Sequence, residues 1–196
     1  MSVVIVSGGI GAGKSTVGAY MEQRGFPVVD ADVAAREVAE PGGPVWTAIV
    51  DAFGSAALAG DGSLDRAFLA GVVFRDDAAR RRLEGITHPA IVERLRQQLS
   101  AAEVPWIFAA VPLYRPELRD LLGASVVWTV VADPTVALQR LVTMRAMSED
   151  DARRRLTAQV TNDVRTAWAD VVIVNDGSLD DLHAAVDRAL AQLAAA

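Results

Sequence analysis

Residues Gly8 to Ser15 read GGIGAGKS and fit the pattern G-x-x-x-x-G-K-[ST], in which backbone N–H groups cradle phosphates. Glycines let the backbone approach an anion closely, and the lysine ammonium reaches the β- and γ-phosphate oxygens. Lys14 is the only lysine of the chain; lysine and arginine together number 19, and all the others are arginine. The motif predicts that the chain holds a nucleoside triphosphate. The residues expected to contact it are Gly11, Ala12, Gly13, Lys14, Ser15 and Thr16.

The Ser15 hydroxyl occupies the position at which such a loop binds Mg²⁺. The alternative for the whole motif is a glycine-rich turn with a coincidental Lys-Ser pair. A buried strand before the loop and a helix after it favour the phosphate site. The choice of lysine favours it as well, because a compact ammonium and a planar guanidinium are not interchangeable at this position.

A pair of carboxylates, Asp30 and Asp32, follows the second expected strand. In an extended chain, side chains two residues apart point to the same side. One carboxylate can accept the proton of an attacking hydroxyl, while the other orients that hydroxyl or holds a water on Mg²⁺. The alternative is that one Asp caps a helix beginning near Val33, since Asp is a favoured N-cap. Capping accounts for one carboxylate and not for two, so we expect a functional pair.

Cationic side chains concentrate between residues 140 and 165, where a mobile segment would deliver positive charge to a transferred phosphoryl group. We expect Arg140 and Arg145 to serve this purpose. Arg153 and Arg154 follow the acidic turn 148–151 at helical spacing, so we expect an ordinary solvated helix face there.

Two histidines and four tryptophans complete the candidates. His88 precedes Pro89, which indicates a helix start or a kink, and His88 is either a residue of the substrate pocket or a structural one. His183 is expected to be structural or exposed. The tryptophans are dispersed, which favours core packing over a base-stacking platform.

The elements that must position these residues follow from the apolar pattern. Strands are expected at 3–6, 27–30, 106–111, 125–131 and 171–174, and their continuous apolar runs are typical of a buried parallel sheet. A helix is expected over 14–23, and a closing helix from Ser178, its N-cap. Residues 33–102 are mainly helical in pattern. We therefore predict an α/β fold: a five-stranded parallel doubly wound sheet with a helical insertion and a helical lid.

Composition excludes several function classes. The formal net charge of −6 argues against broad binding to nucleic-acid backbones. The chain has no cysteine, hence no disulfide and no thiolate chemistry. The apolar run at residues 1–6 lacks a basic segment and a cleavage site, so we expect a strand and not a signal peptide. We expect a cytoplasmic protein, monomeric or weakly self-associating, that binds neither nucleic acid nor membrane.

An ordered set of motifs along nearly the whole chain resembles the dephospho-CoA kinase family. After the P-loop come D-A-D, A-R-x-V with P-G, F-G, D-G-x-L-D-R, H-P-x-I, and a tail ending in I-V-N-D-G. They stand at Asp30–Asp32, Ala35–Val38 with Pro41–Gly42, Phe53–Gly54, Asp61–Arg66, His88–Ile91, Gln139–Arg140, Arg155, Gln159, Ala169–Asp170 and Ile173–Gly177.

The resemblance implies transfer of the ATP γ-phosphoryl group to the ribose 3′-hydroxyl of dephospho-CoA, the last step of coenzyme A synthesis, with Mg²⁺. It implies Asp32 near the acceptor hydroxyl, and near the metal through a water, with Lys14 and Arg140 at the phosphates. Asn175 and Gly177 would border the adenine. The acceptor would contact Asp30, Asp32, Arg36, His88, Pro112 and Leu113. A single kinase domain is implied, with core segments 1–32, 105–139 and 170–196, an insertion of about 33–104 that binds the CoA moiety, and a lid of about 140–169.

The chain departs from the family pattern at residues 111–117. The family motif V-P-L-L-[FY]-E appears as VPLYRPE, with Tyr114 in place of the second leucine and Glu117 displaced by one residue behind a proline. The second lid arginine, Arg145, is followed by Ala146 where relatives have Asp or Gly. We expect the wall of the acceptor site to be reshaped at residues 111–117.

Two other functions stay open from the sequence. One is a P-loop kinase acting on another small nucleotide-like or hydroxylated acceptor, which the altered 111–117 segment favours. The other is a non-catalytic nucleotide-binding protein, which the intact Lys14, Ser15 and aspartate pair disfavour. A GTPase is disfavoured because the chain contains no N-K-x-D motif.

Overall fold

The computed structural model describes residues 2–195, and the chain divides into two units. The first, the sheet unit, is formed by Met1–Val29 and Ala102–Ala196. The second, the helical unit, is formed by Asp30–Ala101.

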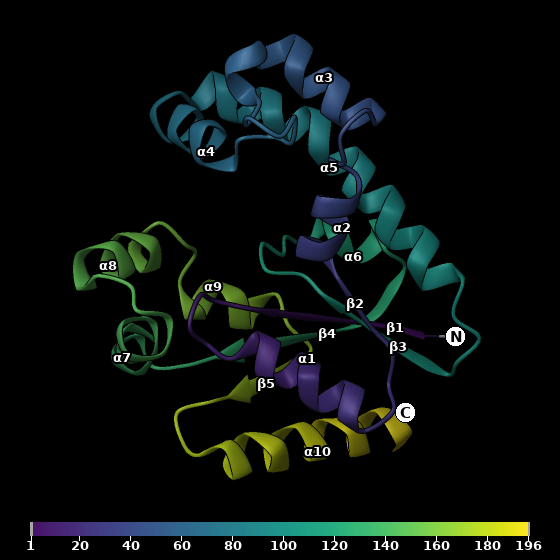
Figure 1. The fold of residues 1–196 in the computed structure, drawn as a ribbon. Helices are drawn as coiled ribbons and strands as arrows, with labels where there is room; N and C mark the ends of the chain where they lie inside the picture. Colours follow the sequence, from purple (N-terminus) through teal and green to yellow (C-terminus); the bar gives the residue numbers. More distant parts are fainter. Residues whose placement is uncertain (1, 196) are drawn as a thin grey trace. The chain divides into compact units, whose positions relative to one another are not determined.

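A five-stranded sheet forms the centre of the sheet unit (Figure 1). Its strands are β1 (Ser2–Gly8), β2 (Val28–Asp30), β3 (Trp106–Ala110), β4 (Ala124–Val131) and β5 (Val171–Val174). Their order is β2-β3-β1-β4-β5, and β1 pairs in parallel with β3 and β4, as β4 does with β5. This arrangement confirms the predicted fold class. The central strand β1 is buried from Val3 to Gly8, as its continuous apolar run requires.

Helices α1 (Lys14–Gln23) and α10 (Leu179–Ala195) cover one face of this sheet. Ser178 is the N-cap of α10, as predicted: its hydroxyl accepts from the Asp181 N–H, and the Asp181 carboxylate accepts from the Ser178 N–H at 2.9 Å. Apolar side chains of the two helices and the sheet form one buried cluster. Its larger members are Val4, Val6, Val17, Met21, Phe108, Trp128, Val130, Ile173, Leu182, Val186 and Leu193.

Four further helices belong to the sheet unit, and two of them, α6 (Glu117–Leu121) and α9 (Asn162–Ala167), contact β4. The other two, α7 (Pro134–Arg145) and α8 (Glu149–Thr157), pack against each other. Arg153 and Arg154 of α8 pair with Glu149 and Asp151 on their own helix, at 2.5 and 2.8 Å. The prediction of an ordinary charged helix face is therefore confirmed for these two arginines.

The helical unit contains α2 (Ala31–Glu37), α3 (Pro44–Phe53), the short 3-10 helix η1 (Ser55–Ala57), α4 (Arg66–Arg75) and α5 (Asp77–Ser100). Val45, Ile49, Ala57 and Leu69 form its small core. Pro89 lies inside α5, which begins twelve residues earlier at Asp77. Of the two alternatives for Pro89, a helix start or a kink, the helix start is therefore wrong. Asp76, whose carboxylate accepts from the N–H groups of Ala78 and Ala79, provides the cap of α5.

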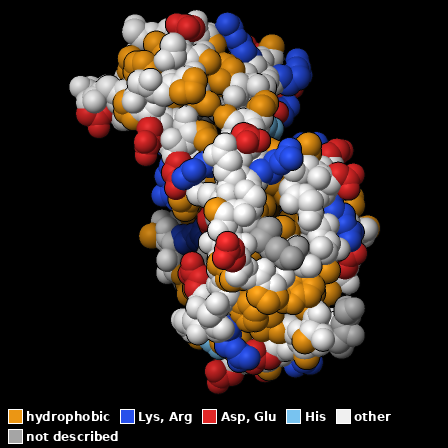
Figure 2. All heavy atoms as spheres, turned by 90° about the vertical axis from the view of Figure 1, so that its right-hand side faces the viewer, with side chains coloured by type: hydrophobic (Ala, Val, Ile, Leu, Met, Phe, Trp, Pro, Cys, Tyr) orange, Lys and Arg blue, Asp and Glu red, His pale blue; other side chains and the backbone are white. Residues whose placement is uncertain are grey.

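The tryptophans and His183 serve packing. Trp128 is fully buried, and Trp46 donates to the carbonyl of Gly62 at 3.0 Å. His183 stacks on Tyr20 with ring centroids 3.9 Å apart. On the face shown in Figure 2, acidic and basic side chains are interspersed and form no continuous basic area. Among the described residues, no helix is both long and apolar enough to cross a membrane.

Candidate active site

The P-loop connects the end of β1 to the start of α1. Gly11 and Gly13 have φ angles of 77° and 100°, in the left-handed region that L side chains rarely adopt. The Gly13 carbonyl accepts from the N–H groups of Thr16 and Val17, so the first turn of α1 forms directly behind the loop. The positive end of the helix dipole therefore points into the loop, with Lys14 half-buried and Ser15 exposed in that turn.

Asn175, the residue after β5, is hydrogen-bonded to the P-loop. Its side-chain amide donates to the carbonyl of Ala12 at 2.8 Å, and its own backbone N–H donates to Val131. It is 5% exposed. Arg140 of α7 donates to the Asn175 carbonyl at 2.8 Å and to its side-chain oxygen at 3.3 Å. Three predicted site elements, the P-loop, Arg140 and Asn175, are thus brought together within the sheet unit, whereas the exposed Gly177 lies two residues further on.

Gly13→Ala is expected to remove nucleotide binding. A Cβ at Gly13 would lie 2.2 Å from the Asn175 amide nitrogen, so the bond to Ala12 has to break. The left-handed φ adds about 1 to 2 kcal/mol of strain. Gly25→Ala is the matched control, because its φ is 82° but its Cβ meets nothing within 4 Å. Titration calorimetry with an ATP analogue should show lost affinity in Gly13→Ala alone; equal affinity in both variants would contradict this assignment.

Two residues that were not among the predicted site residues also contact the P-loop. Gln159, which follows α8, accepts from the backbone N–H of Ile10 through its Oε1 at 3.0 Å. Arg165 of α9 donates to the same oxygen at 3.0 Å. In the sequence, Gln159 and Arg165 both lie in the arginine-rich stretch. The family motifs included Gln159, but nothing in the local pattern distinguished Arg165 from its neighbours. A bond between residues 149 positions apart leaves no periodic signal.

Asp30 and Asp32 have different local roles. Helix α2 starts at Ala31, so the two side chains are not related by strand alternation, and the expectation that they share a side of an extended chain is wrong. Asp30 is the N-cap: its Oδ1 accepts from the Asp32 N–H at 2.7 Å. Asp32 lies in the first turn and its side chain is exposed. The capping alternative accounts for Asp30 and leaves Asp32 as the carboxylate available for chemistry.

Asp30→Ala is expected to lower the stability of the helical unit by about 1 kcal/mol, the usual value of an N-cap. Asp30→Asn should retain the stability, because an amide oxygen caps almost as well. Urea unfolding followed by circular dichroism measures both. A stability equal to wild type in the alanine variant would show that the bond to Asp32 contributes nothing.

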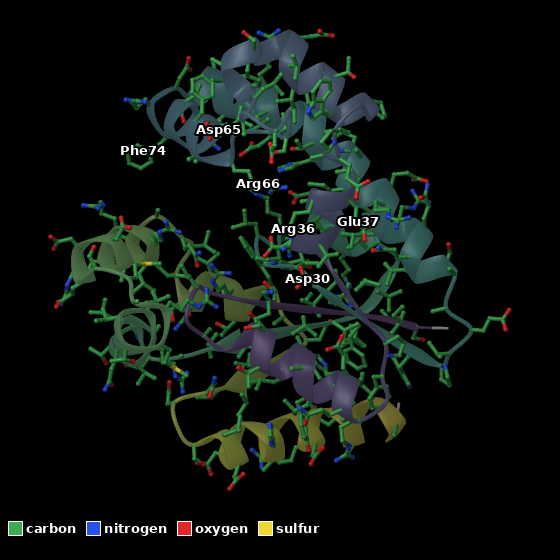
Figure 3. The ribbon with its side chains drawn as sticks, in the orientation of Figure 1. Asp30, Arg36, Glu37, Asp65, Arg66 and Phe74 are labelled. Atoms are coloured by element: carbon green, nitrogen blue, oxygen red, sulfur yellow. The ribbon has the colours of Figure 1, made fainter. Side chains whose placement is uncertain are left out.

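The remaining predicted residues of the helical unit are at its surface. Arg36 donates to the carbonyl of Asp32 at 3.1 Å and is exposed, as is His88 on α5. Glu37 accepts from Arg94 at 2.7 Å and from Gln98 at 3.0 Å, which fixes α2 to α5. Figure 3 shows Asp30, Arg36 and Glu37 projecting from β2 and α2. A hollow of about 440 Å³ lies beside Glu37 and is lined mainly by residues 37–45.

The segment that departs from the family pattern follows β3. Leu113 is 72% exposed, whereas Tyr114 is 6% exposed and packs edge-on against Trp168 at 6.4 Å. Burial raises the pKa of the Tyr114 hydroxyl. Glu117 is exposed and begins α6. The tyrosine therefore fills the interior of the sheet unit, whereas Pro112 is half-buried and Leu113 and residues 115–117 are exposed. Arg145 is exposed at the end of α7.

The family model and the curated relatives agree on one family. The family model described as dephospho-CoA kinase matches residues 2–181. A dephospho-CoA kinase of Corynebacterium glutamicum is 40% identical over 96% of this chain and 95% of its own length. One of Xanthomonas oryzae is 45% identical over 95% and 93%. The crystal structure of TT1252 from Thermus thermophilus has a TM-score of 0.84 at 31% identity, covering 98% of this chain and 97% of that one. This chain belongs to the dephospho-CoA kinase family.

Proposed function

We propose that this protein transfers the γ-phosphoryl group of ATP to the ribose 3′-hydroxyl of dephospho-CoA, giving coenzyme A and ADP. The observation that carries the proposal is the family match over residues 2–181, in a chain whose single lysine stands in a correctly formed P-loop at the start of α1. A second observation supports it: Asp32, in the first turn of α2, has an exposed carboxylate that forms no hydrogen bond or ion pair with the residues the structure describes.

The sheet unit binds the nucleotide. The loop N–H groups and the dipole of α1 bind phosphate oxygens, and the Lys14 ammonium balances charge on the β- and γ-phosphates. Arg140, held by Asn175, adds a second cation behind the loop. Residues 140–169 serve as the lid that closes over the nucleotide.

The donor set fits Mg²⁺. The described residues contain no group of three or more metal-ligating side chains, and Mg²⁺ in phosphoryl-transfer sites needs none, since it takes few protein ligands beside water and phosphate oxygens. The exposed Ser15 hydroxyl would bind it directly and Asp32 through a water. When bound, Mg²⁺ neutralises charge on the phosphate oxygens.

The helical unit binds the acceptor. Asp32 accepts the proton of the 3′-hydroxyl, or fixes its orientation, as that oxygen attacks the γ-phosphorus. Asp30, Arg36 and His88 of this unit contact the acceptor, and the hollow beside residues 37–45 accommodates part of the CoA moiety. Pro112 and Leu113, which belong to the sheet unit, contact the acceptor as well. Reaction requires the P-loop and Asp32 to approach the same phosphoryl group, so residues 33–104 act as an insertion that delivers the acceptor.

The test is to incubate the protein with ATP, Mg²⁺ and dephospho-CoA and to follow products by phosphorus NMR. A new 3′-phosphate resonance, formed in equal amount with ADP, is the expected result. Absence of this product from protein shown by circular dichroism to be folded would overturn the proposal. A panel of other hydroxylated and nucleotide acceptors tests the acceptor assignment separately. If one of them is turned over faster than dephospho-CoA, that assignment alone is overturned.

A further inference from the structure

Arg165 is a buried cation without an acidic partner. It is 5% exposed, and it takes part in none of the ion pairs formed among the described residues. Burial lowers the pKa of its guanidinium, yet arginine stays protonated at physiological pH. A buried charge that is not paired destabilises a fold, so a cation in this position requires a reason other than stability.

The environment of Arg165 is the P-loop itself. A Cβ built on Gly9 would lie 3.5 Å from Gln159 Oε1 and 3.7 Å from Arg165 Nε, so both side chains lie against the loop backbone. Two donors converge on the Gln159 oxygen: the Ile10 N–H at 3.0 Å and the Arg165 Nη2 at 3.0 Å. A backbone N–H of a phosphate-binding loop and a guanidinium are the two donor types that proteins use for phosphoryl oxygens.

We propose that the position of Gln159 Oε1 is a subsite for an oxygen of the terminal phosphoryl group of ATP, and that Arg165 is the cation that binds it. In the structure Gln159 Oε1 fills this subsite and keeps the guanidinium directed at the loop. The inference rests on the proposed function only in that the P-loop holds ATP; it does not depend on the acceptor.

The position of Ile10 in the loop supports assigning this subsite to the terminal phosphoryl group. The N–H groups beside Gly13 and Lys14 are at the start of α1, where the inner phosphates bind. Ile10 lies three residues before Gly13, at the other end of the loop, so its N–H, which here donates to Gln159 Oε1, is placed to donate instead to an oxygen further along the triphosphate. A fixed guanidinium there would stabilise the charge that spreads over the equatorial oxygens during transfer. A lysine would lose its charge on burial more readily than arginine.

The first experiment compares Arg165→Met with Arg188→Met, a matched substitution of an exposed arginine on α10, outside the proposed lid. Binding of a non-hydrolysable ATP analogue and of ADP is measured by calorimetry without any acceptor. Arg165→Met should weaken the analogue by about tenfold or more, the value of a hydrogen bond to a charged group, and ADP by less than about threefold. Arg188→Met should match wild type for both ligands. The melting temperature of Arg165→Met should equal or exceed that of wild type, because the substitution removes an unpaired buried charge. If the role of Arg165 were only structural, the substitution would lower the melting temperature.

A second measurement uses the wild-type protein, so it does not depend on how the variant folds. The Arg165 Nε–H resonance is assigned as the one that disappears in Arg165→Lys, and it should shift with the ATP analogue and far less with ADP. No difference between the two nucleotides in the resonance, or equal loss of both affinities in Arg165→Met, would overturn the proposal. Failure of wild type to phosphorylate dephospho-CoA would overturn the proposed function and leave this inference intact, because both measurements omit the acceptor.

Discussion

Lys14→Met is expected to lower kcat/KM for ATP by about 10²- to 10³-fold, the usual cost of removing one preorganised charge-stabilising group. Methionine keeps the length of the lysine stem and its packing but removes the ammonium. Because Lys14 is the only lysine and the chain otherwise uses arginine, no neighbouring lysine can replace it. Initial-rate kinetics with varied ATP, at saturating dephospho-CoA, measure the effect.

Lys14→Arg separates charge from geometry. It retains the positive charge, but a planar guanidinium cannot reach between the β- and γ-phosphates as a compact ammonium does, so we expect a loss comparable to that in Lys14→Met. Arg188→Met, which removes an exposed cation from α10 of the same unit, is the control for net charge. Wild-type rates in Lys14→Arg would show that any cation suffices and would remove the geometric argument.

The sequence predicted the parts of this site that depend on local pattern. Continuous apolar runs identified all five strands, and the glycine-lysine spacing identified the loop, because burial on both faces and backbone approach to an anion each restrict consecutive residues. The start of α2 was misplaced because the local pattern there fits two structures. Asp-Ala-Asp suits a strand end and a helix cap equally well, and the hydrogen bond from the Asp32 N–H to Asp30 decides between them.

Contacts between distant segments could not be predicted. The Gln159 bond to Ile10, the Asn175 bond to Ala12 and the Tyr114–Trp168 packing each join residues that no short motif relates. Tyr114 shows the consequence. As a departure from the family pattern it suggested a reshaped acceptor wall, but its side chain is buried against Trp168 and leaves Leu113 at the surface. The departure therefore changes the packing of the sheet unit at Tyr114, and the accessible residues of the segment, Pro112, Leu113 and 115–117, are the ones that can convey it to a ligand.

Asp32→Asn is expected to lower kcat by about 10²- to 10⁴-fold, the range typical of losing an acid–base group. The amide has the same shape and keeps the first turn of α2 intact, since the cap is supplied by the Asp30 carboxylate and the Asp32 backbone. An amide cannot accept the proton of the 3′-hydroxyl. Single-turnover quench experiments with enzyme in excess over ATP measure the chemical step directly.

Binding measurements then decide between proton transfer and positioning. If Asp32 acts as the base, calorimetry should give wild-type affinity of Asp32→Asn for the ATP analogue and for dephospho-CoA, with the whole loss in the chemical step. If it mainly orients the acceptor, the amide still accepts a hydrogen bond and most of the rate should remain. Asp51→Asn, an exposed carboxylate on α3 of the same unit, controls for charge. Because Asp30 is committed to its cap, no second carboxylate of the D-A-D motif is free to replace Asp32, so a rate within about threefold of wild type would exclude Asp32 as the general base.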